Sequence, residues 1–453
     1  MRPSPIVPLG AAEDLTETEP ASSGVVSGIR QAGPIAIAGL VANGANVVVT
    51  VVIARLLTSR GYGELAQLNG IFLFLSMPGS AVLVGVVRRA AALRAVGHAE
   101  AVRSFAKRLH AMAVGGVAVL VALAWAIRHP VAGALSLENP GALVAIVAAG
   151  GFWLALSIDR GLLQARRAYR PLAANLLVEG AMRMLFVLIL TAAGLGVTGA
   201  CLGVMLGEAC AAAHASFEST RRWARDASLV RLHNASLHDV SRRRLASDVS
   251  VAFGCLAFLA LLQNLDVILL GRESPKHSGA YAAISVAAKA IVYGAIALGG
   301  YLLPEATIRW HRGEHALRQL ATTALILAVP TVALLGVAVA APRLVLRIAF
   351  GARLVGASGS LATLVLAMAF LCATVLLTNY LLGAGRRWII IVLGVGAAVA
   401  AVALYQAHGD VARTAGTDLV VQAVIAAVVA VGFLLAHRTP SRDEKRAPAR
   451  ARR

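Results

Sequence analysis

Charged residues are scarce in this 453-residue chain, at 14% of the total, whereas apolar residues make up 58%. A soluble domain usually contains about 25% charged and about 45–50% apolar residues. A chain of this composition cannot cover its apolar surface with solvated side chains. The composition therefore excludes a soluble protein and, with it, most classes of enzyme.

Acidic residues are fewer still, at 22 against 42 Lys and Arg, which gives a formal net charge of +20. A basic surface can bind nucleic acid, but here the basic residues are spread over many short loops, and aromatic residues are only 5% of the chain. Nucleic acid is therefore excluded as a partner. Basic loops next to apolar segments instead favour contact with anionic lipid headgroups.

Motifs for catalysis or cofactor binding are also lacking. The four cysteines all lie in apolar segments and form no CxxC pair, so they are expected to be small buried hydrophobes rather than metal ligands. There is no Walker A sequence, which excludes direct use of ATP. The GxGxxG pattern at 194–199 follows an apolar segment rather than a strand, so we expect a tight turn there.

Long apolar segments are what the chain has in abundance. About 20 apolar residues are needed to cross a bilayer as a helix, and helices are required because lipid cannot satisfy open backbone groups. The sequence predicts an all-α polytopic membrane protein with twelve such helices: 33–57, 65–87, 109–127, 141–158, 171–193, 197–217, 248–270, 280–303, 320–341, 358–382, 388–407 and 416–436.

Basic residues fall on alternate loops. Thirty-one Lys and Arg lie on the segments that share a side with the amino terminus, and eight lie on the other loops. Because basic loops stay in the cytoplasm, both termini are expected there, in a bacterial inner membrane. The first 32 residues contain acidic residues and prolines and resemble a disordered tail, not a cleavable signal peptide.

The longest basic loop divides the spans six and six, which predicts two lobes of the same orientation. The expected parts are a tail at 1–32, an N-lobe at 33–217, a linker at 218–247, a C-lobe at 248–437 and a tail at 438–453. A faint repeat at an offset of 216 residues aligns 58–66 with 274–282 and matches Gly63 to Gly279.

Several segments resemble one family of transporters. The segment 54–63, ARLLTSRGYG, is similar to the signature that closes the first span of bacterial polysaccharide and oligosaccharide-lipid flippases. Segments 264–271 and 278–283, and Lys289 followed by Leu303 and Pro304, resemble the region of the seventh and eighth spans of these flippases. Segment 161–165 resembles the loop between their fourth and fifth spans. The resemblance, over roughly 33–310, is to Wzx-type flippases of the MOP (multidrug/oligosaccharidyl-lipid/polysaccharide) exporter superfamily. It implies two six-helix lobes around a central cavity and alternating access.

Charged residues inside predicted spans are the first candidates for a site, because they are costly in lipid and usually face a cavity or a partner. Asn175, Glu179 and Arg183 share one face of the fifth span, and Glu208 lies in the sixth. Arg183 either lines a cavity and binds a lipid pyrophosphate or an acidic sugar, or it pairs with Glu179 or Glu208 and locks two helices. Both roles can coexist.

The second half offers a similar choice. Lys289 and Asp266 lie inside the eighth and seventh spans. Either they pair, or Lys289 binds a substrate anion while Asp266 carries a coupling cation. Asn43, Asn46 and Thr50 share a face of the first span, which is expected to be a cavity wall or a hydrogen-bonding strip.

The sequence thus predicts a flippase for polyprenyl-pyrophosphate-linked oligosaccharide in cell-surface polysaccharide synthesis, with Arg183 and Lys289 as its cationic passage and no metal or cofactor. Lipid-linked oligosaccharide, membrane lipids and other polysaccharide-assembly membrane proteins are the expected partners. One alternative is an ion-coupled multidrug antiporter. The other is a membrane-embedded glycosyltransferase or polymerase, which is disfavoured because the longest outer loop, 342–357, contains no Asp or Glu.

Overall fold

The computed structural model describes residues 38–438, apart from 40, 43, 96–98, 167, 227–241 and 312–315. This part of the chain is helical and contains no strand. The predicted amino-terminal tail, the middle of the linker and nearly all of the carboxy-terminal tail lie outside the described residues.

The first span is helical over Gly44–Leu56. The following helices are α2 (Ser59–Ala95), α3 (Ala99–Ala134), α4 (Pro140–Ala165), α5 (Tyr169–Leu190), α6 (Gly196–Asp226), α7 (Arg242–Glu273), α8 (Ser278–His311), α9 (Leu317–Ala340), α10 (Pro342–Phe350), α11 (Leu361–Gly383), α12 (Ile389–Tyr405) and α13 (Val411–Arg438). A short π-helix, η1 (Thr191–Leu195), joins α5 to α6, and a 3₁₀ segment, η2 (Ala352–Ser360), precedes α11.

Twelve apolar helical segments lie in the described part of the chain at the positions of the twelve predicted spans. Among the described residues, nine helical stretches are long and apolar enough, and one of them, Tyr169–Arg221, contains both α5 and α6. The shorter apolar helices Gly44–Leu56 and Ile389–Tyr405 complete the set. The chain is therefore a multi-pass membrane protein, and the predicted all-α, twelve-span fold is confirmed.

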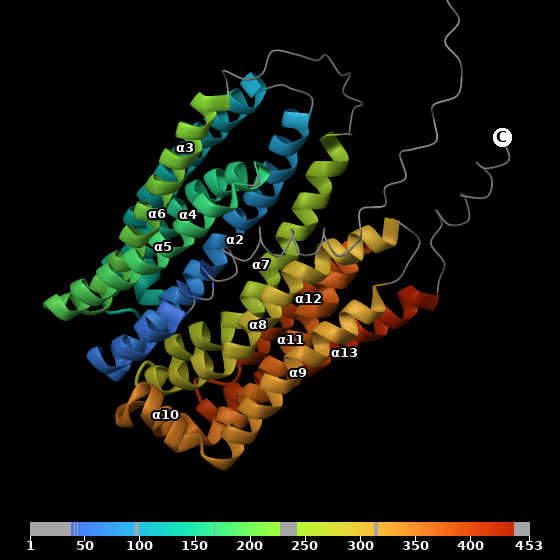
Figure 1. Ribbon diagram of the computed structural model, residues 1–453. Coiled ribbons are helices and arrows are strands. Elements are labelled where there is room, and N and C mark those ends of the chain that lie inside the picture. The colour runs from blue at the N-terminus through green and yellow to red at the C-terminus, as the bar shows by residue number, and fades with distance from the viewer. Residues whose placement is uncertain are drawn as a thin grey trace, which may run out of the picture.

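The helices form two lobes (Figure 1), one ending with α6 and the other beginning with α7. The lobes meet along α2, α7 and α8, and they diverge toward the ends at which α6 stops and α7 starts. We call the end of the molecule at which the lobes diverge the linker side, and the opposite end the far side. The predicted two-lobe arrangement is thus confirmed.

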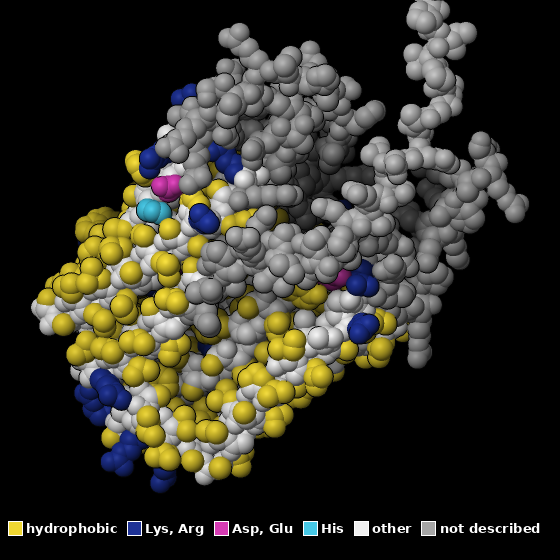
Figure 2. Space-filling model, viewed as in Figure 1, with side chains coloured by type: hydrophobic (Ala, Val, Ile, Leu, Met, Phe, Trp, Pro, Cys, Tyr) yellow, Lys and Arg dark blue, Asp and Glu magenta, His cyan; other side chains and the backbone are white. Residues whose placement is uncertain are grey.

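Burial separates central helices from lipid-facing ones. Of the residues in the most apolar stretch of α4, 67% are buried, and the share is 61% for the stretch that contains α11. The corresponding shares are 11% for α3 and 17% for α9, so these two helices form the outer wall. Figure 2 shows apolar side chains over the broad middle of one face, with Lys and Arg near its two ends. This distribution suits a bilayer between two polar interfaces.

The predicted turn between the fifth and sixth spans is confirmed. Gly194 and Gly196 have φ of 89° and 53°, which favour glycine because it lacks a Cβ atom. The chain can therefore reverse at once, and α6 packs along α5. A Cβ atom on Gly207 would lie 2.7 Å from the Arg183 Cα, and one on Gly203 would overlap the Val187 backbone. These two glycines therefore allow α5 and α6 to pack closely.

The segment predicted as the long outer loop, 342–357, lies between α9 and α11 and is helical. It contains α10 and most of η2. Leu346 and Phe350 of α10 are buried, whereas Leu344 and Ile348 are exposed. Arginines at 343, 347 and 353 interrupt the apolar run, so this short two-sided helix gave no span-like signal.

Candidate functional site

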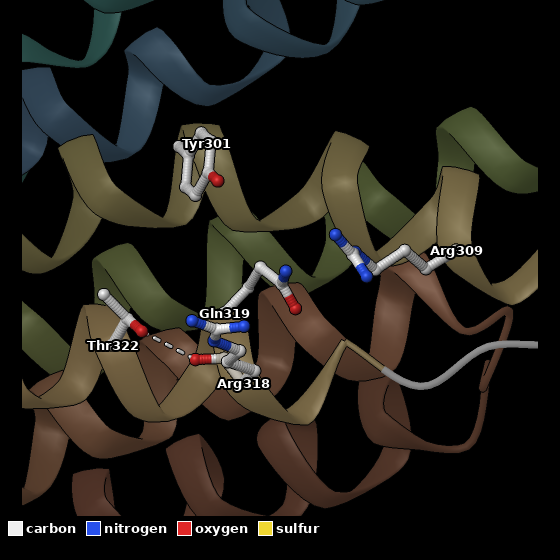
Figure 3. Close-up of a pocket in the computed structure, with 5 residues that line it drawn as sticks. All are labelled: Tyr301, Arg309, Arg318, Gln319 and Thr322. Carbon is white, nitrogen blue, oxygen red and sulfur yellow. Dashed lines mark hydrogen bonds between the residues drawn. The ribbon is translucent and has the colours of Figure 1, made fainter.

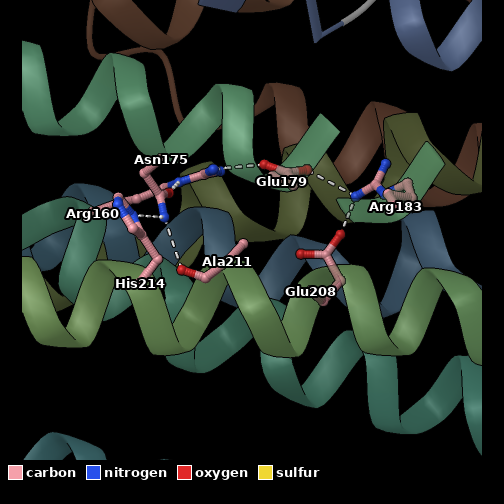
Figure 4. A network of polar contacts seen from close by, with 7 residues as sticks. All are labelled: Arg160, Asn175, Glu179, Arg183, Glu208, Ala211 and His214. Atoms are coloured by element: carbon pink, nitrogen blue, oxygen red, sulfur yellow. Dashed lines mark hydrogen bonds and ion pairs between the residues drawn. The ribbon is translucent and has the colours of Figure 1, made fainter. Parts of the chain in front are cut away.

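A buried polar network joins α4, α5 and α6 in the N-lobe (Figure 4). The guanidinium of Arg183 donates to Glu179, with Nη2 2.8 Å from Oε1, and also to Glu208. The Glu208 side chain is fully buried, and that of Arg183 is 16% exposed. Arg183 therefore pairs with both carboxylates that the sequence offered as partners.

Arg160 of α4 is a second cation in this network. Its Nη2 lies 2.6 Å from Glu179 Oε2, and its Nε donates to Asn175 Oδ1 at 2.7 Å. Asn175 in turn donates to the backbone oxygen of Ala211 on α6 at 2.8 Å. Glu179 thus bridges two arginines, and the asparagine at the head of the predicted stripe belongs to the same network.

Sequence reasoning missed Arg160 because it ended the fourth span at residue 158 and placed 159–170 in a loop. The helix instead continues to Ala165, which carries Asp159 and Arg160 into the packed interior. The apolar residues Leu162 and Leu163, both buried, were the signal that the helix continues.

Two arginines and two glutamates make this network neutral overall. The positive charge of an arginine that is already bound to two carboxylates is neutralised locally, so this arginine attracts a substrate anion only weakly. The geometry therefore favours the helix-locking role of Arg183, and its role in lining a cationic passage stays a prediction.

The C-lobe contains a second buried centre, on α7 and α8. Lys289 Nζ lies 3.3 Å from Asp266 Oδ1, and the hydroxyl groups of Tyr281 and Ser285 donate to Asp266 Oδ2 at 3.2 Å each. The Asp266 side chain is fully buried, and that of Lys289 is 6% exposed. Of the two alternatives, the pairing of Lys289 with Asp266 is the one observed in this structure.

Asp418 of α13 is a third member of this centre, and the sequence analysis did not select it. It is 1% exposed. The side chain of Gln422, which bonds to it, also donates to the Leu262 backbone oxygen on α7, one turn before Asp266, at 3.0 Å. Asp418 Oδ1 accepts a hydrogen bond from Gln422 Nε2 at 3.2 Å, whereas Oδ2 has no partner among the described residues. Thr414, Asp418 and Gln422 are spaced by four, and this polar stripe on an apolar helix was the available signal.

The formal charges of this centre sum to one negative charge when both aspartates are ionised. Asp266 and Asp418 bring two carboxylates, and Lys289 brings one ammonium. The buried oxygens that lack a hydrogen-bond partner in the described part of the chain include Asp418 Oδ2, Gln422 Oε1 and Thr414 Oγ1. Since buried polar atoms are nearly always satisfied, these oxygens mark a place where a proton or a small monovalent cation would be stabilised.

The predicted face of the first span is only partly described. Asn43 lies outside the described residues. Asn46 is half-buried, and its backbone oxygen accepts a hydrogen bond from the Thr50 hydroxyl at 2.8 Å. A lining role for Asn43 and Asn46 stays a prediction.

The two lobes touch on the far side. A Cβ atom on Gly63 would overlap Ser278, and one on Gly279 would overlap the backbone of Ser59. The two glycines matched by the sequence repeat are thus points at which the lobes approach closely. Arg55 Nη2 also donates to the Ile348 backbone oxygen of the C-lobe at 2.7 Å.

A reciprocal bond strengthens this contact, because Arg353 Nη2 donates to the backbone oxygen of Arg55 at 2.7 Å. Each lobe therefore supplies an arginine that holds a carbonyl of the other.

As for metals, the described residues contain no group of three His, Cys, Asp or Glu side chains that could hold a metal ion.

Comparison with known proteins gives fold evidence alone. No family model matches the chain, and no curated protein matches it. Among solved structures, the inward-facing conformation of a multidrug resistance MATE family transporter of the MOP superfamily superposes with a TM-score of 0.64 at 12% identity, over 88% of this chain and 96% of that one. The chain has the fold of the MATE transporters.

Other solved structures agree. A mutant of the Vibrio cholerae MATE transporter VcmN gives a TM-score of 0.59 at 13% identity, over 93% of this chain and 98% of that one. An outward-facing multidrug resistance MATE transporter gives 0.57 at 12% identity, over 90% and 95%.

Proposed function

We propose that the chain is an exporter of the MOP superfamily that moves a small organic molecule across the bacterial inner membrane in exchange for a proton or another monovalent cation. The observation that carries this proposal is the buried centre of Asp266, Lys289 and Asp418, in which one carboxylate oxygen lacks a partner among the described residues. Ionisable groups inside a membrane are costly, so they are kept mainly where they serve transport.

The proposed cycle uses the two lobes as rigid bodies. With the far side closed by Gly63, Gly279 and the paired arginines, substrate would enter from the linker side, which is expected to be cytoplasmic because its loops are basic. A cation on Asp418 would neutralise the centre and change how α13 packs against α7, to which Gln422 is bonded through the Leu262 oxygen at 3.0 Å. Transport of this kind needs no covalent step.

The proposal is tested with purified protein in liposomes. A pH gradient is imposed, and accumulation of a fluorescent organic cation is followed in wild type, Asp266→Asn and Asp418→Asn. The matched control is Asp410→Asn, an exposed aspartate just before α13 that caps the Arg413 backbone at 2.7 Å. Asn caps helices about as well as Asp, so the control should transport normally.

Loss of gradient-driven accumulation in both buried variants, with normal transport by the control, is the expected result. A sodium gradient in place of the pH gradient identifies the cation. Wild-type protein that accumulates no substrate with either gradient would contradict the proposal.

A second candidate, the flippase for polyprenyl-pyrophosphate-linked oligosaccharide, is favoured by one observation. The segments that resemble flippase signatures, 54–63 and 278–283, contact each other across the lobes through Gly63 and Ser278. Both assignments share alternating access, and they differ in substrate. Translocation of a fluorescent polyprenyl-pyrophosphate oligosaccharide by the reconstituted protein, without gradient-driven uptake of organic cations, would replace the first proposal with the second.

A further inference from the structure

A hollow of ≈ 210 Å³ lies between the linker-side ends of α8 and α9 (Figure 3). It is lined by Tyr301 and Arg309 of α8 and by Arg318, Gln319 and Thr322 of α9. It lies apart from both buried centres, and neither proposed transport function uses it.

The lining side chains carry positive charge and no negative charge. Two of the five are arginines, and none is a carboxylate. The guanidinium of Arg309 is held by Glu305, with Nε 2.8 Å from Oε1, and hydrogen bonding assigns the Gln319 amide oxygen to the same guanidinium at 2.9 Å. Arg318 is exposed and has no carboxylate partner among the described residues. The hollow therefore has one arginine that is held in place and one arginine that no carboxylate neutralises in the described part of the chain.

The hollow lies at the linker-side end of an apolar stretch, which is the depth at which lipid headgroups are expected. The apolar stretch of α9 that can cross a membrane begins at Leu317, next to Arg318. Farther along α9, Leu325, Val329 and Val332 are 70%, 69% and 68% exposed, as expected of side chains that face acyl chains. A lipid that lies along this wall would bring its headgroup to the two arginines.

We propose that this hollow binds the phosphate group of an anionic membrane lipid in the leaflet on the linker side. Guanidinium groups match phosphate oxygens with two parallel N–H donors, and the hollow is wide enough for a phosphate with its ester oxygens. Arg309 would be oriented in advance by Glu305 and Gln319, and Arg318 would close over the ligand. The site would tie the α8–α9 corner of the C-lobe to the lipid composition of one leaflet.

The test uses the purified full-length chain and a photo-crosslinkable phosphatidylglycerol at a concentration below saturation. Cross-links are mapped by mass spectrometry to peptides covering 301–322. An arginine near an anionic lipid contributes about 1 kcal/mol, which is about fivefold in affinity, so Arg309→Gln with Arg318→Gln should lower the yield there by about 30-fold. The matched control, Arg343→Gln with Arg347→Gln, removes the same charge from far-side α10 and should leave the yield unchanged.

A variant that is expected to raise the cross-linking yield excludes misfolding as the explanation of a lowered yield. Glu305→Gln removes the carboxylate beside Arg309 and should raise the cross-linking yield severalfold. Unlabelled phosphatidylglycerol should compete with the probe, whereas phosphatidylcholine and millimolar inorganic phosphate should compete weakly. Equal yields in wild type and the double arginine variant would overturn the proposal, and inorganic phosphate competing as well as the lipid would overturn the lipid as its source.

Discussion

Replacing Arg183 with glutamine separates its two possible roles. The change keeps a hydrogen-bonding side chain but removes the charge between Glu179 and Glu208. Glu208 is fully buried, and its Oε2 already has no partner among the described residues. The variant would therefore leave a carboxylate inside the membrane with no countercharge beside it.

The expected loss of stability follows from that charge. Insertion scales give about 2.5–3.5 kcal/mol for a charge at the centre of a membrane helix, and breaking a buried ion pair costs about 3–5 kcal/mol. A lost interhelical hydrogen bond in a membrane costs only about 0.6 kcal/mol. The unpaired charge thus dominates, and Arg183→Gln should lose about 3 kcal/mol, with Arg160 limiting the loss through its bond to Glu179.

The assay is thermal denaturation in detergent, followed by fluorescence-detected size exclusion. Arg183→Gln should lose its monodisperse peak at a clearly lower temperature than wild type, and Arg183→Gln with Glu208→Gln should recover most of the loss. The control Arg343→Gln, on the short far-side helix α10, should change stability by no more than about 0.5 kcal/mol. An Arg183→Gln protein as stable as wild type but unable to transport would refute the pairing argument and restore the cationic passage.

Two further predictions concern closure and topology. Gly279→Ala places a methyl group against the backbone of Ser59, so it should separate the lobes on the far side and lengthen or broaden the distribution of spin-label distances between them. The control Gly336→Ala, with nothing within 4 Å of the new Cβ, should leave that distribution unchanged. A wild-type distribution in Gly279→Ala would contradict the role of this contact. In a cysteine-free background, Lys276→Cys on the far side should react with an impermeant thiol reagent on intact cells and Ser228→Cys should not, whereas labelling of Ser228→Cys would reverse the orientation.

The fold was predictable because each span is a long apolar run. Even the turn at Gly194 and Gly196 could be predicted, since two glycines end one run and begin the next. Two features were not predictable in this way. α10 is short, and its arginines interrupt the apolar pattern that would have indicated a helix with a buried face. α4 continues past residue 158, where a single Asp-Arg pair resembles the start of a loop in any hydropathy scale.

The candidate site was less accessible to sequence analysis, because pairing depends on packing between helices. Spacing placed Glu179 and Arg183 on one face, but only the fold brings Arg160 to Glu179. In the C-lobe, Lys289 and Asp266 were visible as intramembrane charges. Asp418 was passed over because it lies close to the start of its predicted span, where a polar residue resembles a loop end.

Proton movement by the reconstituted protein tests the central claim most directly. A pH-sensitive dye trapped in liposomes reports protons, and a labelled organic cation reports substrate, in wild type and in Asp418→Asn. We expect wild-type protein to move protons when substrate is added, and Asp418→Asn to exchange substrate across the membrane without moving protons or accumulating substrate against a gradient. Proton movement coupled normally to substrate in Asp418→Asn would contradict the account.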